Sequence, residues 1–331
     1  PVKPFLTRNI LRAPMHLEWC RSECCSEHLL KNKDGKTILR LENGVSEKID
    51  ADFQHYFGLE RLGSLSRQDI NELSAIVSKK QSVNFGKDEV FLKIDIVPGG
   101  DFPFEILTGC NGVPLIVRNI KGCKYLPDAR RIIRKKGFIK TVNPIPELTY
   151  HNFEKTAFFA FFNHLGEETA VFKSGNLKKQ ALYIIENCQI LHFAGHSEFN
   201  KEGAPVFQLD GLNSVYLSGN DITTLENVPE FIWMNSCESA CRGINSWAEI
   251  FLKKGCRCFI GCSSFIKDDI AEKAAAVFYK NLSFGETAGY SYHLMKKELL
   301  TVPESFFFRF YGDELFRINI VKEVADVGKR I

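Results

Sequence analysis

The sequence predicts an α/β protein whose mainly parallel sheet of about six strands carries helices on both faces. Short apolar runs bounded by polar residues or glycine recur along the chain, as in strands that are buried on both faces. Helical segments of about ten residues alternate with these runs. Two of the runs, Ile190–Ala194 and Phe231–Met234, each stop at a polar loop. If these strands are parallel neighbours, both loops lie at the same edge of the sheet.

Composition limits the class of protein and its compartment. The chain has 331 residues, 44% hydrophobic and 25% charged, which is ample for one large or two ordinary domains. A net charge of +3 without a long single-sign run indicates no evident direct nucleic-acid site, with a local basic patch as the alternative. We find no signal peptide and no apolar run of about 18 residues, so we expect a cytoplasmic protein without a membrane partner. Eleven cysteines are too sparse for a disulfide scaffold and fit a reducing compartment.

Residues 1–88 are predicted to form a small N-terminal region of uncertain fold, ahead of the main domain at 89–331. Because the chain begins at Pro1, we expect a processed form or a piece of a longer protein. Histidine and cysteine recur at every fourth position, at His16, Cys20, Cys24 and His28. On a helix these side chains would share one face and could hold zinc. An amphipathic helix without metal is the favoured alternative, because the CxxC spacing of structural zinc sites is missing. Residues 33–36 predict a hairpin turn.

The first half of the main domain is assigned in chain order. Apolar patterns predict strands at 90–97, 113–117, 138–142 and 170–172, and a helix at 153–162. A helix at 176–186 leads into the strand that ends before His196. A small hairpin follows at 206–217, and either Ser218 or Asp221 caps a short helix.

The second half follows the strand that ends before Cys237. Ser246 and Glu249 predict a capping box, and the helix that they start ends at Gly255. A buried strand is expected at 257–260. Asp269 with Glu272 predicts the start of a helix that runs to Gly285. A second helix at 286–300 and strands at 306–310 and 315–318 complete the domain.

A thiol and an imidazole follow the two strands named first. Cys237 begins a polar loop, and a cysteine thiolate is a strong nucleophile once a neighbouring base takes its proton. His196 is the candidate base, and the backbone amides of Ser197 and Cys237 are candidate donors to an oxyanion. The alternative is a strand that ends in histidine by chance and one more packed thiol. His192, within an apolar run, is interpreted as a hydrogen-bonded core histidine.

Acidic residues are candidates for substrate binding. Asp268 and Asp269 would form the floor of a pocket for a basic side chain. For both aspartates a helix cap is an equally good interpretation. Glu198 and Asp210 are weaker candidates, and Cys241 is a less favoured candidate for a redox partner of Cys237 or a second nucleophile. Because glycine-rich phosphate loops are absent, nucleotide chemistry is not expected, and the proposed reaction requires no metal or cofactor.

The residues around the two loops resemble a known family. Leu191-His192-Phe193-Ala194-Gly195-His196, followed by Asn235-Ser236-Cys237-Glu238-Ser239, is similar to the paired signature of CHAT-domain peptidases. These are caspase-like cysteine peptidases related to separase, caspases and gingipains. Further resemblances extend the match from about residue 89 to 321, at Phe102–Glu105, Asn143-Pro144, Lys267–Asp269, Phe278–Leu282 and Phe310–Asp313.

The resemblance implies a caspase-like sandwich with Cys237 as nucleophile, His196 as general base, and the amides of residues 197 and 237 as the oxyanion hole. Family members usually have glycine after the histidine, where this chain has Ser197. The resemblance also implies a protein or peptide substrate and an activating partner protein or ribonucleoprotein. Some relatives, fused behind helical repeats, act in RNA-guided antiviral (CRISPR type III) assemblies, and others act in cell-death-like defence. Two alternatives remain: an inactive caspase-like scaffold, and a zinc-stabilised adaptor built on residues 16–28.

Overall fold

The fold is described from a computed structural model of the chain. It describes residues 15–21, 28–32, 37–41, 91–96, 104, 115–123, 132–133, 139–142, 168–170, 175–210, 214–240, 246–300 and 302–320. The backbone alone is described for the strands before residue 42, for the short strands between 132 and 170, and for residues 319–320. The predicted helix at 153–162 lies outside the described residues.

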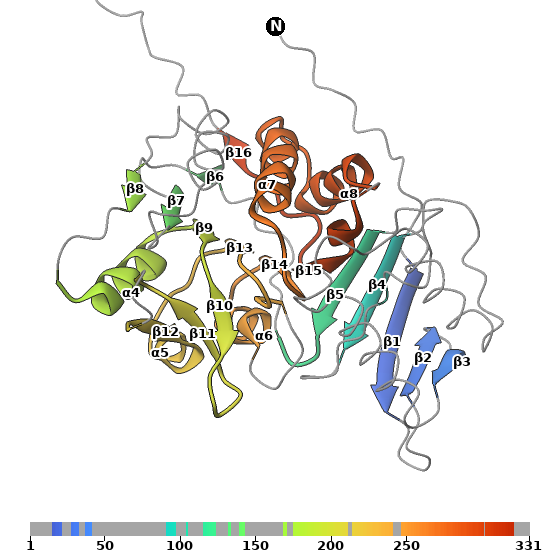
Figure 1. The fold of residues 1–331 in the computed structure, drawn as a ribbon. Helices are drawn as coiled ribbons and strands as arrows, with labels where there is room; N and C mark the ends of the chain where they lie inside the picture. The colour runs from blue at the N-terminus through green and yellow to red at the C-terminus, as the bar shows by residue number, and fades with distance from the viewer. Residues whose placement is uncertain are drawn as a thin grey trace, which may run out of the picture.

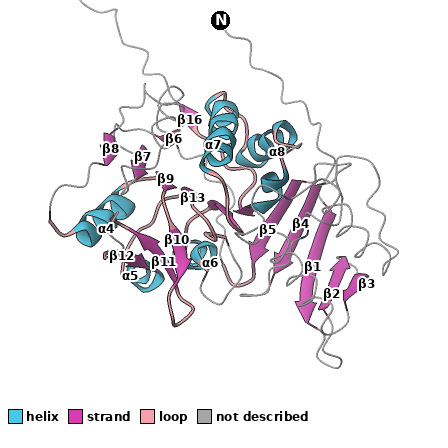
Figure 2. Ribbon diagram, in the orientation of Figure 1, coloured by secondary structure: helices cyan, strands magenta, loops and turns pink. Residues whose placement is uncertain are grey.

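An eleven-stranded sheet runs through the described part of the chain in the order β3-β2-β1-β4-β5-β15-β14-β13-β9-β7-β8 (Figures 1 and 2). Its strands are β1 (Met15–Arg21), β2 (His28–Asn32), β3 (Thr37–Leu41), β4 (Phe91–Ile96), β5 (Leu115–Ile120), β7 (Ile139–Val142), β8 (Glu168–Ala170), β9 (Ile190–Ala194), β13 (Phe231–Asn235), β14 (Cys258–Cys262) and β15 (Phe308–Gly312). A separate pair joins β6 (Ile132–Ile133) to β16 (Asn319–Ile320).

Most neighbours in the large sheet are parallel. β8, β7, β9, β13 and β14 form one parallel block, and β1, β4, β5 and β15 form another. The two blocks meet at the antiparallel pair of β14 and β15. The predicted α/β class, with a mainly parallel sheet, is therefore confirmed. The whole sheet is wider than the six main strands expected, because further strands extend both of its edges.

The N-terminal strands overturn one expectation from the sequence. His16 and Cys20 lie in β1 and His28 in β2, so the predicted helix over 16–28 is wrong. β1 pairs with β2 in antiparallel orientation and with β4 in parallel, and these long-range partners override the four-residue spacing. Cys24 lies outside the described residues. β2 and β3 are antiparallel, as expected of strands joined by a hairpin, and the turn predicted at 33–36 itself lies outside the described residues. The domain boundary at residue 88 stays a prediction.

Helices cover both faces of the sheet and enclose two hydrophobic cores (Figure 1). Along β13, Ile232 and Met234 contribute to one core and Phe231 and Trp233 to the other, as expected where side chains alternate across a strand. The first core lies under α4 (Leu177–Asn187), α5 (Gly219–Thr223) and α6 (Trp247–Lys253). The second lies under α7 (Asp268–Ser283) and α8 (Ala288–Glu298). None of the helices described is both long and apolar enough to cross a membrane.

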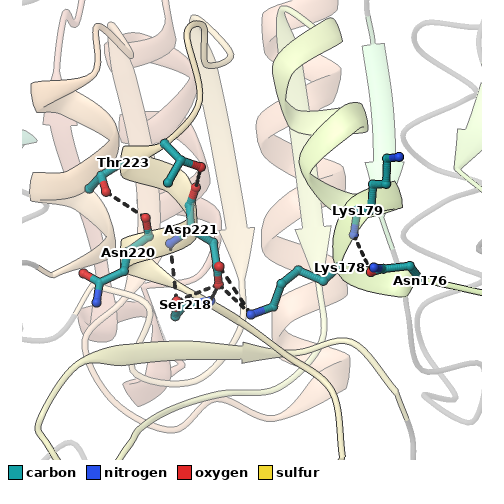
Figure 3. A network of polar contacts seen from close by, with 8 residues as sticks. Asn176, Lys178, Lys179, Ser218, Asn220, Asp221 and Thr223 are labelled. Carbon is teal, nitrogen blue, oxygen red and sulfur yellow. Dashed lines mark hydrogen bonds and ion pairs between the residues drawn. The ribbon is translucent and has the colours of Figure 1, made fainter.

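A three-stranded antiparallel sheet follows the histidine loop, in the order β10-β11-β12. β11 (Pro205–Gln208) and β12 (Tyr216–Ser218) confirm the predicted hairpin, and β10 (Ser197–Phe199) adds a strand that the sequence pattern did not predict. Ser218 and Asp221 form a reciprocal capping box at α5, and Lys178 of α4 pairs with Asp221 at 3.1 Å (Figure 3). This contact joins the two helices beside the small sheet.

Three local expectations in the second half have mixed outcomes. Ser246 is the N-cap of α6 and accepts from the amide of Glu249, as predicted. The predicted cap at Asp269 is wrong: Lys267 is the N-cap of α7, and both aspartates lie in its first turn, where negative charge is favourable. The strand expected at 315–318 is also wrong, because residues 313–318 form turns between β15 and β16.

Candidate active site

His196 and Cys237 lie in neighbouring loops at one edge of the sheet. β9 and β13 are parallel, and Ala194 is in register with Asn235 at the end of each strand. The amide of Gly195 donates to the carbonyl of Asn235 at 3.3 Å, so the pairing continues up to the loops. The structure thus brings together the two residues that the sequence analysis singled out, at the edge where open α/β sheets bind ligands.

Gly195 is required by packing rather than by a left-handed turn. A Cβ atom at this position would lie 2.7 Å from the ring of Phe207. That ring also packs against Phe193, with centroids 4.5 Å apart. The glycine therefore lets the histidine loop lie directly on the small sheet. The lack of space for a side chain, rather than the backbone conformation, explains why residue 195 is glycine.

The Cys237 thiol is half-buried against the core on the α7 side of the sheet. Its sulfur lies 3.9 Å from the carbonyl oxygen of Ile266. Burial raises the pKa of the thiol above its ordinary value, and the carboxylates of Glu238 and Asp268 raise it further. The His196 ring is exposed, and among the described contacts no hydrogen bond joins it to the thiol. In this conformation Cys237 is a thiol rather than a thiolate at neutral pH.

This arrangement predicts the pH dependence of Cys237 alkylation. The rate with iodoacetamide should rise about tenfold per pH unit through the neutral range, because only the thiolate reacts. Its midpoint should lie above 9.0, the ordinary value from which the pKa is raised. Mass spectrometry of the Cys237 peptide measures the rate, and Cys237→Ala supplies the background. A midpoint near neutrality that moves in His196→Ala would contradict an uncoupled thiol.

The backbone after the nucleophile candidate turns through a strained residue. Glu238 has a φ of 56°, in the left-handed region that side chains other than glycine rarely adopt. Such a conformation costs about 1–2 kcal/mol and needs support from its surroundings. The amide of Glu238 donates to the carbonyl of Ser264 at 3.1 Å, which ties this turn to the loop after β14.

Ser239 supports the same loop from inside the protein. Its buried hydroxyl lies 2.9 Å from the carbonyl of Met234 and 2.8 Å from that of Ser236, and it accepts from the amide of Cys262 at 2.9 Å. It therefore joins the end of β13 to the end of β14 beneath Cys237. From the sequence, Ser239 was identified only as part of a motif. A small polar residue in a polar loop does not indicate that its hydroxyl joins two strand ends.

Ser239→Ala should lower the free energy of unfolding by about 1–3 kcal/mol, because it removes the acceptor of a buried amide and the single donor that two buried carbonyls share. Urea denaturation followed by fluorescence measures the change. Ser283→Ala is the matched control, since its exposed hydroxyl bonds only the carbonyl of Lys280 within its own helix. Equal losses in the two variants would show that the Ser239 hydroxyl does not support the loop.

The candidate oxyanion donors are positioned by strand register. Gln208 donates to the carbonyl of His196 at 2.9 Å, and Ser197 lies opposite Phe207 in the next pair. Because bonded and non-bonded pairs alternate in antiparallel ladders, the Ser197 amide points away from β11. The Cys237 amide has no acceptor among the described residues. Both groups are thus available to a ligand.

The other candidates of the sequence analysis fall into two groups. Asp268 and Asp269 are exposed in the first turn of α7, and Asp268 lies close enough to Cys237 to affect its pKa. Glu238 is half-buried, and burial and the charge of Glu198 raise its pKa, so acidic side chains surround the thiol.

The second group is structural. His192 is buried and hydrogen-bonded to the hydroxyl of Tyr279 at 2.9 Å, as interpreted from the sequence. Asp210 accepts from the amide of Ser214 within the hairpin turn. Cys241 lies outside the described residues. Within the described part of the chain, no three histidine, cysteine or acidic side chains are grouped as metal ligands would be.

Comparison with known proteins finds a family model that matches the part of the chain that contains this site. Residues 154–302, which include His196 and Cys237, match the CHAT domain. No match was found among curated proteins. The fold is similar to gingipain R, with a TM-score of 0.50 at 10% identity over 83% of this chain and 75% of that one. A complex of the Porphyromonas gingivalis RgpB pro- and mature domains gives 0.50 at 9% identity, over 83% and 76%.

A more distant likeness is to separase in the Saccharomyces cerevisiae separase–securin complex. Its TM-score is 0.48 at 14% identity, over 68% of this chain. The chain spans 15% of the length of that separase chain, and 18% in a second structure of the complex. Because the identity is so low, the similarity to gingipain shows only that this chain has the caspase-like fold.

Proposed function

We propose that this chain, which carries a CHAT domain and so belongs with the caspase-like cysteine peptidases, cleaves a protein substrate through Cys237 and His196. One observation carries the proposal. The register of β9 and β13 brings a thiol and an imidazole to one sheet edge, beside two backbone amides that are free to bind an oxyanion.

The proposed reaction uses only groups of this chain, the substrate and water. His196 takes the thiol proton, and the Cys237 sulfur attacks the scissile carbonyl carbon. The carbonyl oxygen becomes an oxyanion, which accepts from the amides of Ser197 and Cys237. Collapse breaks the C–N bond, and His196 returns its proton to the leaving amine. A water molecule, deprotonated by His196, then hydrolyses the thioester and restores the thiol. No metal or cofactor takes part.

The described conformation fits a resting state that a partner or ligand activates. Thiolate formation is disfavoured by burial and by the neighbouring carboxylates, and the thiol lies against Ile266 rather than against the imidazole. A shift that turns Cys237 towards His196 would reverse both effects. By resemblance to CHAT relatives, the activator is a protein or ribonucleoprotein in a cytoplasmic antiviral or cell-death-like defence system.

The acidic surroundings of the thiol favour a basic residue before the cleaved bond. Asp268 and Asp269 open α7 next to the site, and Glu238 flanks the nucleophile. A lysine or arginine side chain would pair with these carboxylates and relieve their mutual repulsion. Asp268, which affects the thiol itself, is the better placed of the two aspartates.

A peptide-library digest analysed by mass spectrometry tests the proposal. The wild type is compared with Cys237→Ala and His196→Ala, each in buffer and with lysate from the native host. Cleavage that disappears in both variants supports the dyad and identifies the preferred residue, and Asp268→Asn tests a basic preference. Cleavage only with lysate indicates an activating partner. If no peptide is cleaved under any condition and peptide electrophiles do not label Cys237, the peptidase proposal is refuted.

The unionised thiol also favours a second candidate, an inactive caspase-like scaffold that binds proteins without chemistry. This scaffold predicts that Cys237→Ala leaves partner binding intact and that no condition produces cleavage. The digest and a pull-down with Cys237→Ala separate the two functions.

A further inference from the structure

A hydrogen bond links the two candidate catalytic loops directly. The hydroxyl of Ser197, the residue after His196, donates to the backbone carbonyl of Cys237. Ser197 is only 8% exposed, so water competes little for this carbonyl. The main chain of the candidate base and that of the candidate nucleophile are thus held together by one side chain.

The accepting carbonyl belongs to the peptide unit that joins Cys237 to Glu238. The amide of the same unit donates to the carbonyl of Ser264 at 3.1 Å. Both polar ends of this peptide plane are therefore held, one from the histidine loop and one from the loop after β14. A peptide plane held at both ends fixes the ψ angle of Cys237 and the φ angle of the next residue.

That next residue is the strained one. Glu238 has a φ of 56°, which an L side chain disfavours and glycine adopts freely. Glu238 and Glu198, the residue after Ser197, carry like charges that repel each other across the same two loops. Both effects would pull the Cys237 loop away from its position. The hydroxyl of Ser197 opposes both.

We propose that Ser197 is a positioning residue that clamps the Cys237–Glu238 peptide and thereby holds the main chain of the nucleophile, with its amide, beside the histidine loop. The role rests on the proposed peptidase function. A glycine here would leave the carbonyl of Cys237 without this donor.

Strain relief supplies a specific test in the full chain. Ser197→Ala should lower kcat for a peptide identified in the digest by about 10- to 100-fold, as small misplacements of reacting groups do, with KM changed less than about twofold. Adding Glu238→Gly should restore most of this loss, because glycine needs no clamp at positive φ. Adding Glu238→Ala removes the same carboxylate but keeps the strain, so it should restore little. Ser197→Thr, which keeps the hydroxyl, should resemble the wild type.

Alkylation of Cys237 separates failure of the clamp from failure of the peptidase. Loosening the loop in Ser197→Ala should speed alkylation by iodoacetamide at least about threefold at pH 8 and move its midpoint to lower pH, because burial then raises the pKa of the thiol less. Glu238→Gly should reverse this change and Glu238→Ala should not. If the wild type cleaves nothing, this series still tests the clamp. Unchanged alkylation in Ser197→Ala, or equal rescue by glycine and alanine, overturns it.

A further double variant guards against misfolding. If Ser197→Ala does not fold, Ser197→Gly with Glu238→Gly replaces it, since two glycines remove the hydroxyl and the strain together. Thiol reactivity close to that of the wild type in this double variant supports the clamp. Reactivity as high as in the urea-unfolded chain overturns it.

Discussion

Cys237→Ala is expected to reduce kcat/KM for a cleaved peptide to the uncatalysed background, a loss of at least about 10⁴-fold. Alanine has no nucleophilic atom, and the thiol of Cys262, at the end of the neighbouring strand β14, is fully buried and cannot replace it. His196→Ala should cost about 10²–10⁴-fold, the usual contribution of a positioned general acid–base. Initial rates on a fluorogenic peptide taken from the digest measure both losses.

The two losses should not be additive. If thiol and imidazole act as one unit, the double variant is no slower than Cys237→Ala alone. Cys123→Ala is the matched control, because Cys123 is also a half-buried free cysteine, but it follows β5 in another part of the sheet. Its activity should stay within about twofold of the wild type. A Cys237→Ala variant that retains cleavage would remove this residue from the reaction.

Trp233→Ala is expected to lower the free energy of unfolding by about 3–5 kcal/mol. The indole is fully buried in β13, with ring centroids 4.8 Å from Phe278, 5.7 Å from Tyr279 and 5.8 Å from Phe308. Its removal leaves a cavity between β13 and α7, in the strand that leads to Cys237. Urea denaturation followed by circular dichroism measures the loss.

Two controls show whether the loss comes from the cavity. Trp233→Phe should cost less than half as much, because it fills most of the space and removes an indole N–H that has no hydrogen-bond partner. Phe284→Ala should change stability by less than about 0.5 kcal/mol, since that ring is 75% exposed. A Trp233→Ala variant as stable as Phe284→Ala would contradict the packing described for this core.

The two loops of the candidate site could be identified from the sequence because their signals are local. The runs before His196 and Cys237 are apolar apart from His192 and buried throughout, as expected of strands covered on both faces, and polar residues mark where each one ends. Parallel strands end at one edge, so the pattern predicts that the loops meet. Capping at Ser218 and Ser246 was predictable for the same reason, since a cap depends on residues within one turn.

Other features depend on partners far away in the chain. The four-residue spacing of His16 and Cys20 fits a helix, but pairing with β4 makes that segment a strand. The raised pKa of the Cys237 thiol results from burial and from nearby carboxylates. One of these carboxylates belongs to Asp268, which lies 31 residues further along the chain. The spacing of residues in the sequence does not reveal such effects of burial and charge on a pKa.

The chain by itself therefore determined the fold class, the edge of the sheet and the two residues that meet there. Only the tertiary structure decided how they meet: a thiol turned towards Ile266, a left-handed Glu238, and the hydroxyls of Ser239 and Ser197 that hold the loop. Hydrophobic periodicity is a property of adjacent residues and can be read along the chain. Hydrogen bonds between loops from different strands exist only after the sheet has brought those loops together.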